Sequence, residues 1–376
     1  MTASKAGPSN SPSIYFPLAE AVWFEYFYGC MKHSTKPILV IKFGTASITR
    51  DNGELNENVI AEIAQQVSAV HEQYNIVLVS SGAVAAGKRY LKDYSGTISE
   101  RKAAAAIGNP ILLNRYSHYF SAYGIPIAQS LCERRHFSSR NQFLQLKKTY
   151  EELWESGIIP IANENDVVSD LELKFSDNDE LATLIAVGFG ATQLLFSTSV
   201  GGVLDKEGKI VPEIPVIDEN ALGLADTKKS SLGLGGMVSK LTFTRLATRM
   251  GIEVVIFGIS TPDGIALATA GKTGTRCLPQ PCSMPARKKW LASGSLVTGR
   301  LLVDEGAHKA LEKRHSLLAV GVKQVLEKFE CGEVFEIVTE NEQVIAVARA
   351  KVSSDALGGG RTQNLEVAHA DDIVLL

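Results

Sequence analysis

A lysine at the end of an apolar run is the first feature of this sequence that could do chemistry. In "ILVIKFGTAS", residues 38–47, apolar residues lead directly into Lys42. Because an unpaired charge is costly to bury, a buried strand that ends in this way predicts an anion at its tip. Gly44 follows this run and Gly82 follows a second one, and glycines at such points let a ligand approach the backbone. Alternatively, the strand ends one residue earlier and Lys42 is solvated.

A glycine-rich segment offers a second place for an anion. "LGLGGMVSK", residues 232–240, has glycines just before a predicted helix, and Lys240 lies about one turn inside that helix. Backbone N–H groups of glycines can approach an oxyanion closely, and the positive end of the helix points towards it. The chemistry indicated is phosphate binding. The alternative is a flexible glycine loop with a lysine on the surface.

Carboxylates and amides gather in two further segments, "NENDVV" at residues 163–168 and "KFSDNDELA" at residues 174–182. Ser176 and Asp179 could form only the capping box of the following helix. That interpretation leaves Asn178 and the preceding "NEND" unexplained. Neither segment has the spacing of a metal site.

The elements that must position these residues alternate between short apolar runs and longer segments of helical period. We expect strands at residues 38–43, 76–81, 125–130, 158–163, 193–198 and 253–258. We expect helices at residues 55–70, 99–123, 140–156, 179–189 and 236–250. Uniformly apolar strands separated by helices predict an α/β fold with a mostly parallel open sheet sandwiched by helices. Ligands of such sheets bind at the carboxyl ends of the strands, where the segments described above lie.

The two ends of the chain have a different character. "CLPQPCSMPARKKW" is rich in proline and basic residues and predicts a linker. Short alternating runs after it, such as "GEVFEIVTE" and "QVIAVARAKV", predict a small β-rich domain. We therefore expect a disordered extension at residues 1–34, the main domain at residues 35–284 and the second domain at residues 285–376. The alternative for the extension is an aromatic docking arm.

Composition excludes several classes of protein. Of 376 residues, 45% are hydrophobic and 21% charged, and the net charge of −3 gives no electrostatic footprint for nucleic acid or an anionic membrane. The five cysteines form no CxxC pair and no apolar run could span a bilayer, so we expect a cytoplasmic protein. No GxSxG or HExxH motif is present. "AGKT", residues 270–273, is no P-loop, because Ala266 stands where the first glycine is required.

Six motifs, taken in order, resemble the glutamate 5-kinases of the amino acid kinase superfamily. They are "VIKFGTAS", "VSSGAVAAG", "AAIGNP", "IIPIANENDVV", "ELKFSDNDELAT" and "GLGGMVSKL". "NEND" followed by "DND" separates this family from the related aspartokinases, acetylglutamate kinases and uridylate kinases. "GRLLVDEGAHKAL" and "HSLLAVGV" resemble the PUA domain appended to bacterial forms.

The resemblance implies the amino acid kinase fold and ATP-dependent phosphorylation of the γ-carboxylate of L-glutamate, the first step of proline synthesis. Carried over by motif, Lys42 and Lys240 contact the transferred phosphoryl group, and Asp179 organises these two lysines. The same motifs assign glutamate binding to Ser81, Asp166 and Asn178. Asp166 is then the natural partner of the substrate ammonium.

The resemblance also implies a nucleotide side of the site, with Mg²⁺ bridging the phosphates of ATP. The residues that it assigns to ATP are Lys42, Thr198, Ser199, Leu234, Gly235, Gly236, Met237, Val238, Ser239 and Lys240. Ser199 stands where Asp is usual, Leu234 stands where Thr is usual, and Ser239 replaces Thr. Ala46 is an intruding residue in the first loop, and Ser176 replaces a glycine.

The remaining expectations concern partners. We expect feedback inhibition by L-proline, a homo-oligomer, no membrane and no nucleic acid. One rival function is a kinase for another small carboxylate or carbamate on the same fold. The other is an RNA-binding or RNA-modifying protein, because PUA domains occur in such proteins.

Overall fold

The computed structural model describes residues 36–375 apart from positions 51, 139, 169–176, 225–235, 282–296, 342 and 358–364. The extension predicted at residues 1–34 and the domain boundary predicted between residues 284 and 285 lie outside this part. Within it, no helix combines the length and the apolar character needed to cross a membrane.

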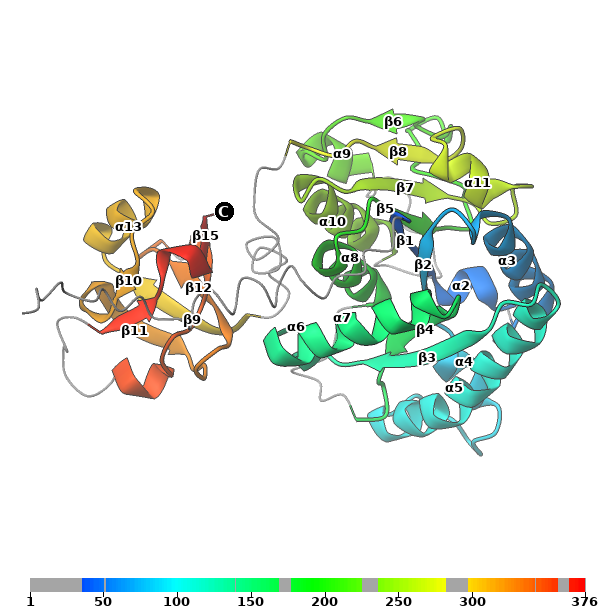
Figure 1. Ribbon diagram of the computed structural model, residues 1–376, viewed down its shortest axis with the longest axis horizontal. Helices are drawn as coiled ribbons and strands as arrows, with labels where there is room; N and C mark the ends of the chain where they lie inside the picture. Colours follow the sequence, from blue (N-terminus) through cyan, green and yellow to red (C-terminus); the bar gives the residue numbers. More distant parts are fainter. Residues whose placement is uncertain are drawn as a thin grey trace, which may run out of the picture. The chain divides into compact units, whose positions relative to one another are not determined.

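An eight-stranded sheet forms the main part of the chain, in the order β3-β4-β2-β1-β5-β7-β8-β6 (Figure 1). Its strands are β1 (Ile38–Phe43), β2 (Asn75–Ser80), β3 (Ile127–Cys132), β4 (Ile159–Glu164), β5 (Gln193–Ser197), β6 (Glu213–Ile214), β7 (Glu253–Phe257) and β8 (Thr275–Cys277). The first six strands in the spatial order are parallel to their neighbours, whereas β8 runs antiparallel to β7. The prediction of a mostly parallel open sheet is confirmed.

Two of the expectations about strands were inaccurate for local reasons. The third strand was predicted to begin at residue 125 but begins at Ile127. Pro126 has no N–H group to donate to a neighbouring strand, so the strand cannot begin before it. Its carbonyl accepts from the Ile159 N–H at 3.0 Å, and pairing of β3 with β4 begins at Ile127. The strands β6 and β8 are too short to show a period, and Cys277, predicted in the linker, is the last residue of β8.

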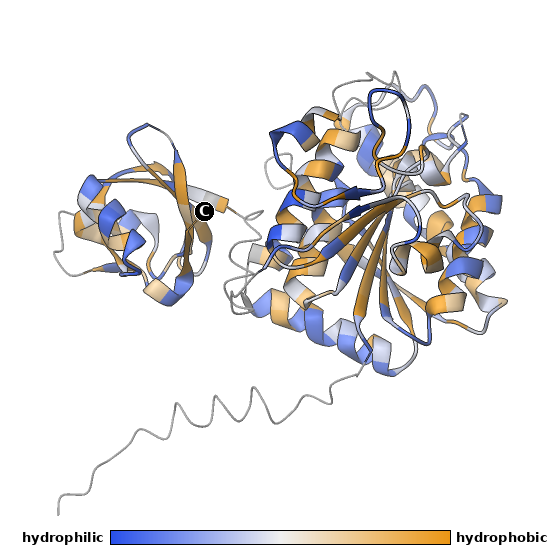
Figure 2. Cartoon of the chain, turned by 90° about the horizontal axis from the view of Figure 1, so that it is seen from above, coloured by the Kyte–Doolittle hydropathy of each residue, from blue (hydrophilic) through white to orange (hydrophobic). Residues whose placement is uncertain are grey.

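Helices cover both faces of the sheet. One face packs against α7 (Arg140–Glu155), α8 (Asn178–Phe189) and α10 (Gly236–Arg249), and the other against α3 (Glu57–Val70), α5 (Ile98–Ser121) and α11 (Gly264–Thr269). Side chains of β1 alternate between these layers, because Val40 faces the first and Leu39 and Ile41 face the second. Both faces being buried explains why the central strands are mainly apolar, as the orange along much of the sheet in Figure 2 shows.

Short helices begin directly after two of the strands. After β1 comes α2 (Thr45–Ile48), and after β2 comes α4 (Ala83–Lys88), which starts from Gly82 with φ at +102°. The helix α4 crosses α5 in backbone contact: a Cβ atom on Gly87 would lie 1.9 Å from the Ala104 carbonyl oxygen, and one on Gly108 would lie 1.7 Å from that of Ala83. The glycines therefore fix α4 against α5. Two more short helices are α6 (Arg135–Ser138) and α9 (Glu219–Gly223).

The C-terminal part is β-rich, as predicted. A five-stranded sheet has the order β11-β9-β12-β13-β15, and β10 pairs with β14. These strands are β9 (Val297–Val303), β10 (Leu317–Leu318), β11 (Val322–Glu327), β12 (Val334–Val338), β13 (Val344–Arg349), β14 (Glu366–Ala368) and β15 (Ile373–Leu375). Its helices are α13 (Glu305–Glu312), η2 (Ala319–Gly321), η3 (Ser354–Leu357) and η4 (Ala370–Asp372). The rings of Phe329 and Phe335 stack within a separate core at 4.4 Å between centroids.

Candidate active site

One buried carboxylate joins two buried lysines. Asp179 Oδ1 lies 2.5 Å from Lys42 Nζ, and Asp179 Oδ2 lies 3.0 Å from Lys240 Nζ. The side chain of Asp179 is 1% exposed, that of Lys42 is 6% exposed and that of Lys240 is 10% exposed. The alternatives in which Lys42 is solvated and Lys240 lies on the surface are therefore wrong.

The topology brings these three residues together from distant parts of the chain. Lys42 is the penultimate residue of β1, which lies between the parallel strands β2 and β5 in the middle of the sheet. Asp179 is in the first turn of α8, which packs against β1, and Lys240 is in α10, which packs against α8. The three side chains thus meet at the carboxyl end of β1, where ligands of open α/β sheets bind.

The electrostatics of this group favour a further anion. Burial lowers the pKa of Lys42, the negative charge of Asp179 opposes that shift, and the positive charge of Lys240 adds to it. With both lysines protonated, Asp179 lies between two positive charges, and the negative charge of Asp177 also favours the protonated form of Lys42. A phosphate or carboxylate bound beside the lysines would stabilise both ammonium groups.

The first turn of α8 is held by Asp177. One oxygen of its carboxylate accepts from the N–H groups of Asp179 at 2.8 Å and Glu180 at 3.1 Å. The other oxygen accepts from the hydroxyl of Ser239, which ties α10 to α8. The N-cap of α8 is therefore Asp177, so the alternative in which Asp179 serves only a capping box with Ser176, which lies outside the described residues, is wrong. An Asp at this place suits the positive end of a helix as well as Ser does.

Amide side chains form a network beside the charged group. Asn178 donates from Nδ2 to Ser81 Oγ at 2.8 Å and to Asn163 Oδ1 at 2.9 Å. Asn163 in turn donates to Asn109 Oδ1 at 3.1 Å. The Oδ1 atom of Asn178 is buried without a protein partner among the described residues, so it can accept from a bound molecule.

Two members of this network, Asn109 and Asn163, were not singled out from the sequence. The signal was present, since Asn163 opens "NENDVV" and Asn109 lies in "AAIGNP". Their roles become visible only when α5 and β4 lie side by side. Pro110 follows Asn109 inside α5.

A cavity of about 480 Å³ opens beside the amide network. Ser81, Asp166 and Asn178, which the motifs assign to the substrate, all line it. Its other lining residues are Thr45, Gly82, Ala83, Val84, Ala85, Lys88, Tyr94, Gly96, Arg101, Asn163, Glu164 and Asp177. The three predicted substrate residues are thus brought to one cavity, and α4 and α5 supply two cations, Lys88 and Arg101, that the sequence did not single out.

The two glycines predicted to face phosphate take different positions. A Cβ atom on Gly44 would lie 3.6 Å from Lys42 Nζ, so the backbone at Gly44 is close to the ammonium group. Gly82 has a left-handed backbone and lines the cavity, where it allows the sharp turn from β2 into α4.

The residues predicted to bind ATP are only partly described. Leu234 and Gly235 lie outside the described residues. Gly236 and Val238 are exposed at the start of α10, whereas Met237 packs against the core. Thr198 follows β5 and donates from its N–H to the Phe257 carbonyl at 2.8 Å, and Ser199 beside it is exposed. Their contact with a nucleotide stays a prediction.

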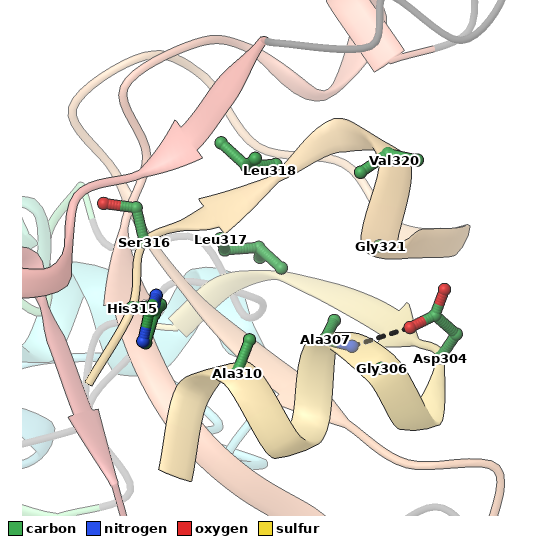
Figure 3. A pocket seen from close by; sticks show the side chains of 10 residues that line it. All are labelled: Asp304, Gly306, Ala307, Ala310, His315, Ser316, Leu317, Leu318, Val320 and Gly321. Atoms are coloured by element: carbon green, nitrogen blue, oxygen red, sulfur yellow. Dashed lines mark hydrogen bonds between the residues drawn. The ribbon is translucent and has the colours of Figure 1, made fainter. Parts of the chain in front are cut away.

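A second hollow, of about 520 Å³, lies in the C-terminal part between α13 and β10 (Figure 3). Its lining is mainly small and apolar, and none of its ten described lining residues is Lys or Arg. Asp304 accepts from the Ala307 N–H at 2.7 Å and so caps α13. The hollow offers no lysine or arginine for phosphate groups.

Comparisons with known proteins identify the class of the chain. The model of the Amino acid kinase family matches residues 37–258, and that of the PUA domain matches residues 299–363. The first match covers more than half of the chain and contains the Lys42–Asp179–Lys240 group. The chain therefore belongs to the amino acid kinase family.

Curated relatives give a narrower similarity. The chain is 34% identical over 366 residues to a glutamate 5-kinase from Haemophilus influenzae (strain PittEE), which covers 91% of this chain and 99% of the relative. It is also 34% identical to a glutamate 5-kinase from Vibrio vulnificus (strain YJ016), over 90% of this chain and 96% of the relative. The resemblance read from the six motifs is confirmed.

Among solved structures, the chain is similar to one titled "Structure of Giardia Carbamate Kinase". The two share 18% identity with a TM-score of 0.49, over 66% of this chain and 100% of the other.

Proposed function

We propose that this chain transfers the γ-phosphoryl group of ATP to the γ-carboxylate of L-glutamate, the activity for which its curated relatives are named. The products are L-glutamyl 5-phosphate and ADP, which makes this the first step of proline synthesis. The observation that carries the assignment of the site is the bridge of Asp179 between Lys42 and Lys240.

The chemistry requires positioning and charge more than proton transfer. The γ-carboxylate has a reference pKa of about 4.3, so it is ionised at neutral pH and needs no general base. One of its oxygens forms a bond to the γ-phosphorus as the bond from that phosphorus to the β–γ bridging oxygen breaks. Negative charge then spreads over the phosphoryl oxygens, and cations fixed around them lower the barrier.

Lys42 and Lys240 supply those cations. Each is buried, and each is held by one oxygen of Asp179, so neither has to reorganise when charge develops. Asp179 acts as a positioning residue in this account, because both of its oxygens already face lysines. Gly44, whose backbone approaches Lys42 Nζ, leaves room for the phosphoryl group there.

The cavity beside this group receives glutamate. Asn178, which precedes Asp179 in the chain, and Ser81 line this cavity, and the free Oδ1 atom of Asn178 provides an acceptor for the substrate. Asp166, which lines the same cavity, pairs with the substrate ammonium. N-acetylglutamate, which has no ammonium, is then a poor acceptor.

The nucleotide occupies the side formed by Thr198, Ser199 and the segment from residue 234 to Lys240. The described residues contain no group of three acidic, histidine or cysteine side chains that could cage a metal ion. Asp177 accepts hydrogen bonds at both carboxylate oxygens, and each oxygen of Asp179 forms an ion pair with a lysine. Mg²⁺ would neutralise charge on the phosphates of ATP, whose oxygens it prefers, and no residue is assigned to it.

The test is ADP release with L-glutamate, L-aspartate and N-acetylglutamate compared side by side. Turnover should depend on L-glutamate and be far lower with the other two. Equal rates with glutamate and N-acetylglutamate would contradict the assignment of Asp166 and favour another small carboxylate as substrate. L-proline should inhibit in competition with glutamate, and insensitivity at high millimolar proline would reject that corollary alone.

A further inference from the structure

One charge of the proposed substrate has no partner among the residues assigned so far. At neutral pH glutamate carries an acceptor γ-carboxylate, an α-ammonium and an α-carboxylate. In the proposed function the first attacks the phosphoryl group held by Lys42 and Lys240, and the second pairs with Asp166. A carboxylate taken out of water without a partner would weaken binding, so the cavity needs a cation for the third charge.

The cavity lining contains two basic residues, Lys88 and Arg101. Within the part of the chain that the structure describes, neither has an ion-pair or hydrogen-bond partner. Lys88 is half-buried, and its Nζ atom lies close to Gly53, where an added Cβ atom would approach it to 2.7 Å. Arg101 is exposed in the first turn of α5, a place that the helix dipole makes unfavourable for a cation.

The position of Lys88 suits the far end of a five-carbon dicarboxylate. Helix α4 starts directly after Ser81 and Gly82, and Lys88 is six residues beyond Gly82, about 9 Å along the axis. Lys88 lines the same cavity as Ser81, and its ammonium lies beside Gly53. The contact of Gly87 and Gly108 with neighbouring backbone fixes this helix against α5, so the ammonium group is carried by a rigid element.

We propose that Lys88 binds the α-carboxylate of glutamate and that Arg101 adds to the positive field at that end of the cavity. This inference rests on the proposed function and extends it to substrate selectivity. The competing explanation is that Lys88 only caps the C-terminal end of α4, where a cation is favourable in any case. The two explanations differ in what they predict for a substrate without the α-carboxylate.

That substrate is 4-aminobutyrate, which keeps the ammonium and the acceptor carboxylate of glutamate. Dissociation constants for both compounds are measured by calorimetry on the full chain without ATP, for wild type, Lys88→Met and Lys88→Arg. Wild type should prefer glutamate, and Lys88→Met should reduce that preference by about 10- to 100-fold, the range of a charge-assisted hydrogen bond. Lys88→Arg should restore most of it.

Arg89→Met is the matched control. Arg89 follows Lys88, is exposed, pairs with Glu54 and does not line the cavity, so its loss should leave the preference unchanged. Thermal unfolding of each variant checks that it folds. A Lys88→Met protein that keeps the preference, or that loses affinity for both compounds equally, would overturn the inference.

The proposed function is tested separately in the same preparations. Wild type that releases ADP with glutamate, while the preference survives Lys88→Met, overturns the inference alone. Wild type that shows the Lys88-dependent preference but no glutamate-dependent ADP release overturns the kinase assignment and supports the binding site. Wild type that binds no glutamate overturns both.

Discussion

Replacing Asp179 by Asn tests whether this carboxylate acts through charge or as a base. The change keeps the size of the side chain and removes the negative charge that holds Lys42 at 2.5 Å and Lys240 at 3.0 Å. Both lysines then repel each other across a buried site. We expect the activation free energy to rise by about 2–4 kcal/mol, as it does when other preorganised groups of active sites are removed. This corresponds to a fall in kcat of roughly 30- to 1000-fold.

The pH dependence of kcat provides the sharper measurement. Burial lowers the pKa of Lys42, and the negative charge of Asp179 opposes that shift. Without the carboxylate the pKa of Lys42 should fall further, so the ammonium loses its proton at lower pH. The alkaline decline of kcat should therefore move to lower pH in Asp179→Asn than in the wild type.

Stability has to be followed in the same variant. Removing one partner of a buried ion pair typically costs about 3–5 kcal/mol, and here two lysines lose their partner. Urea unfolding should show a loss of that order, and kcat is measured at a temperature at which the variant is folded. Asp218→Asn is the control, because Asp218 caps α9 from an exposed position and Asn caps as well as Asp.

Two results would refute this reasoning. If the wild type shows an acid-side limb of kcat that disappears in Asp179→Asn, Asp179 is a general base. If the alkaline limb moves to higher pH or stays in place, Asp179 does not set the proton affinity of Lys42.

The remaining predictions concern the second lysine, the helix crossing and the C-terminal part. Lys240→Met should lower kcat about as much as Asp179→Asn, while the dissociation constant of glutamate, measured by calorimetry, changes little. A large loss of glutamate affinity would contradict the assignment of Lys240 to the phosphoryl group. Gly108→Ala should lower the free energy of unfolding by about 1–3 kcal/mol or more through overpacking against the Ala83 carbonyl, whereas Gly223→Ala, with open space at its Cβ position, should not. Urea unfolding compares the two, and equal stability would show that α4 and α5 adjust freely. A chain truncated after Pro285 should keep kinase activity if it folds, because every residue assigned to chemistry precedes it; a folded but inactive truncation would show that the C-terminal part completes the site.

The fold was predictable where the pattern is local. Six apolar runs predicted six parallel strands, because a strand covered on both faces is apolar at most of its positions. The shift of β3 and the helical starts of α2 and α4 were not predictable in the same way. They depend on a single missing N–H at Pro126 and on the left-handed Gly82, whose effects appear only when the neighbouring strand or helix is in place.

The site was predictable where its residues lie in local motifs at the ends of predicted strands. The predicted substrate residues Ser81, Asp166 and Asn178 line one cavity, because Ser81 and Asp166 follow the strands β2 and β4 and Asn178 opens α8, which packs against β1. Asn109 and Lys88 were missed. Lys88 lines the cavity from α4, and Asn109 joins the amide network from α5. The crossing of these two helices depends on close glycine contacts rather than on an apolar period.

Lys42 shows what physical chemistry adds to pattern. A lysine at the end of a buried strand requires a counter-charge, but the sequence has 41 acidic residues and no local rule chooses among them. The fold determines which acidic residue pairs with Lys42. Helix α8 packs against β1, and its first turn places Asp179 at the end of that strand. The same carboxylate then also serves Lys240, so one negative charge is shared by two positive ones. The two buried ammonium groups around Asp179 lie where an arriving anion would be stabilised, and an anion that arrives and leaves is what a phosphoryl transfer supplies.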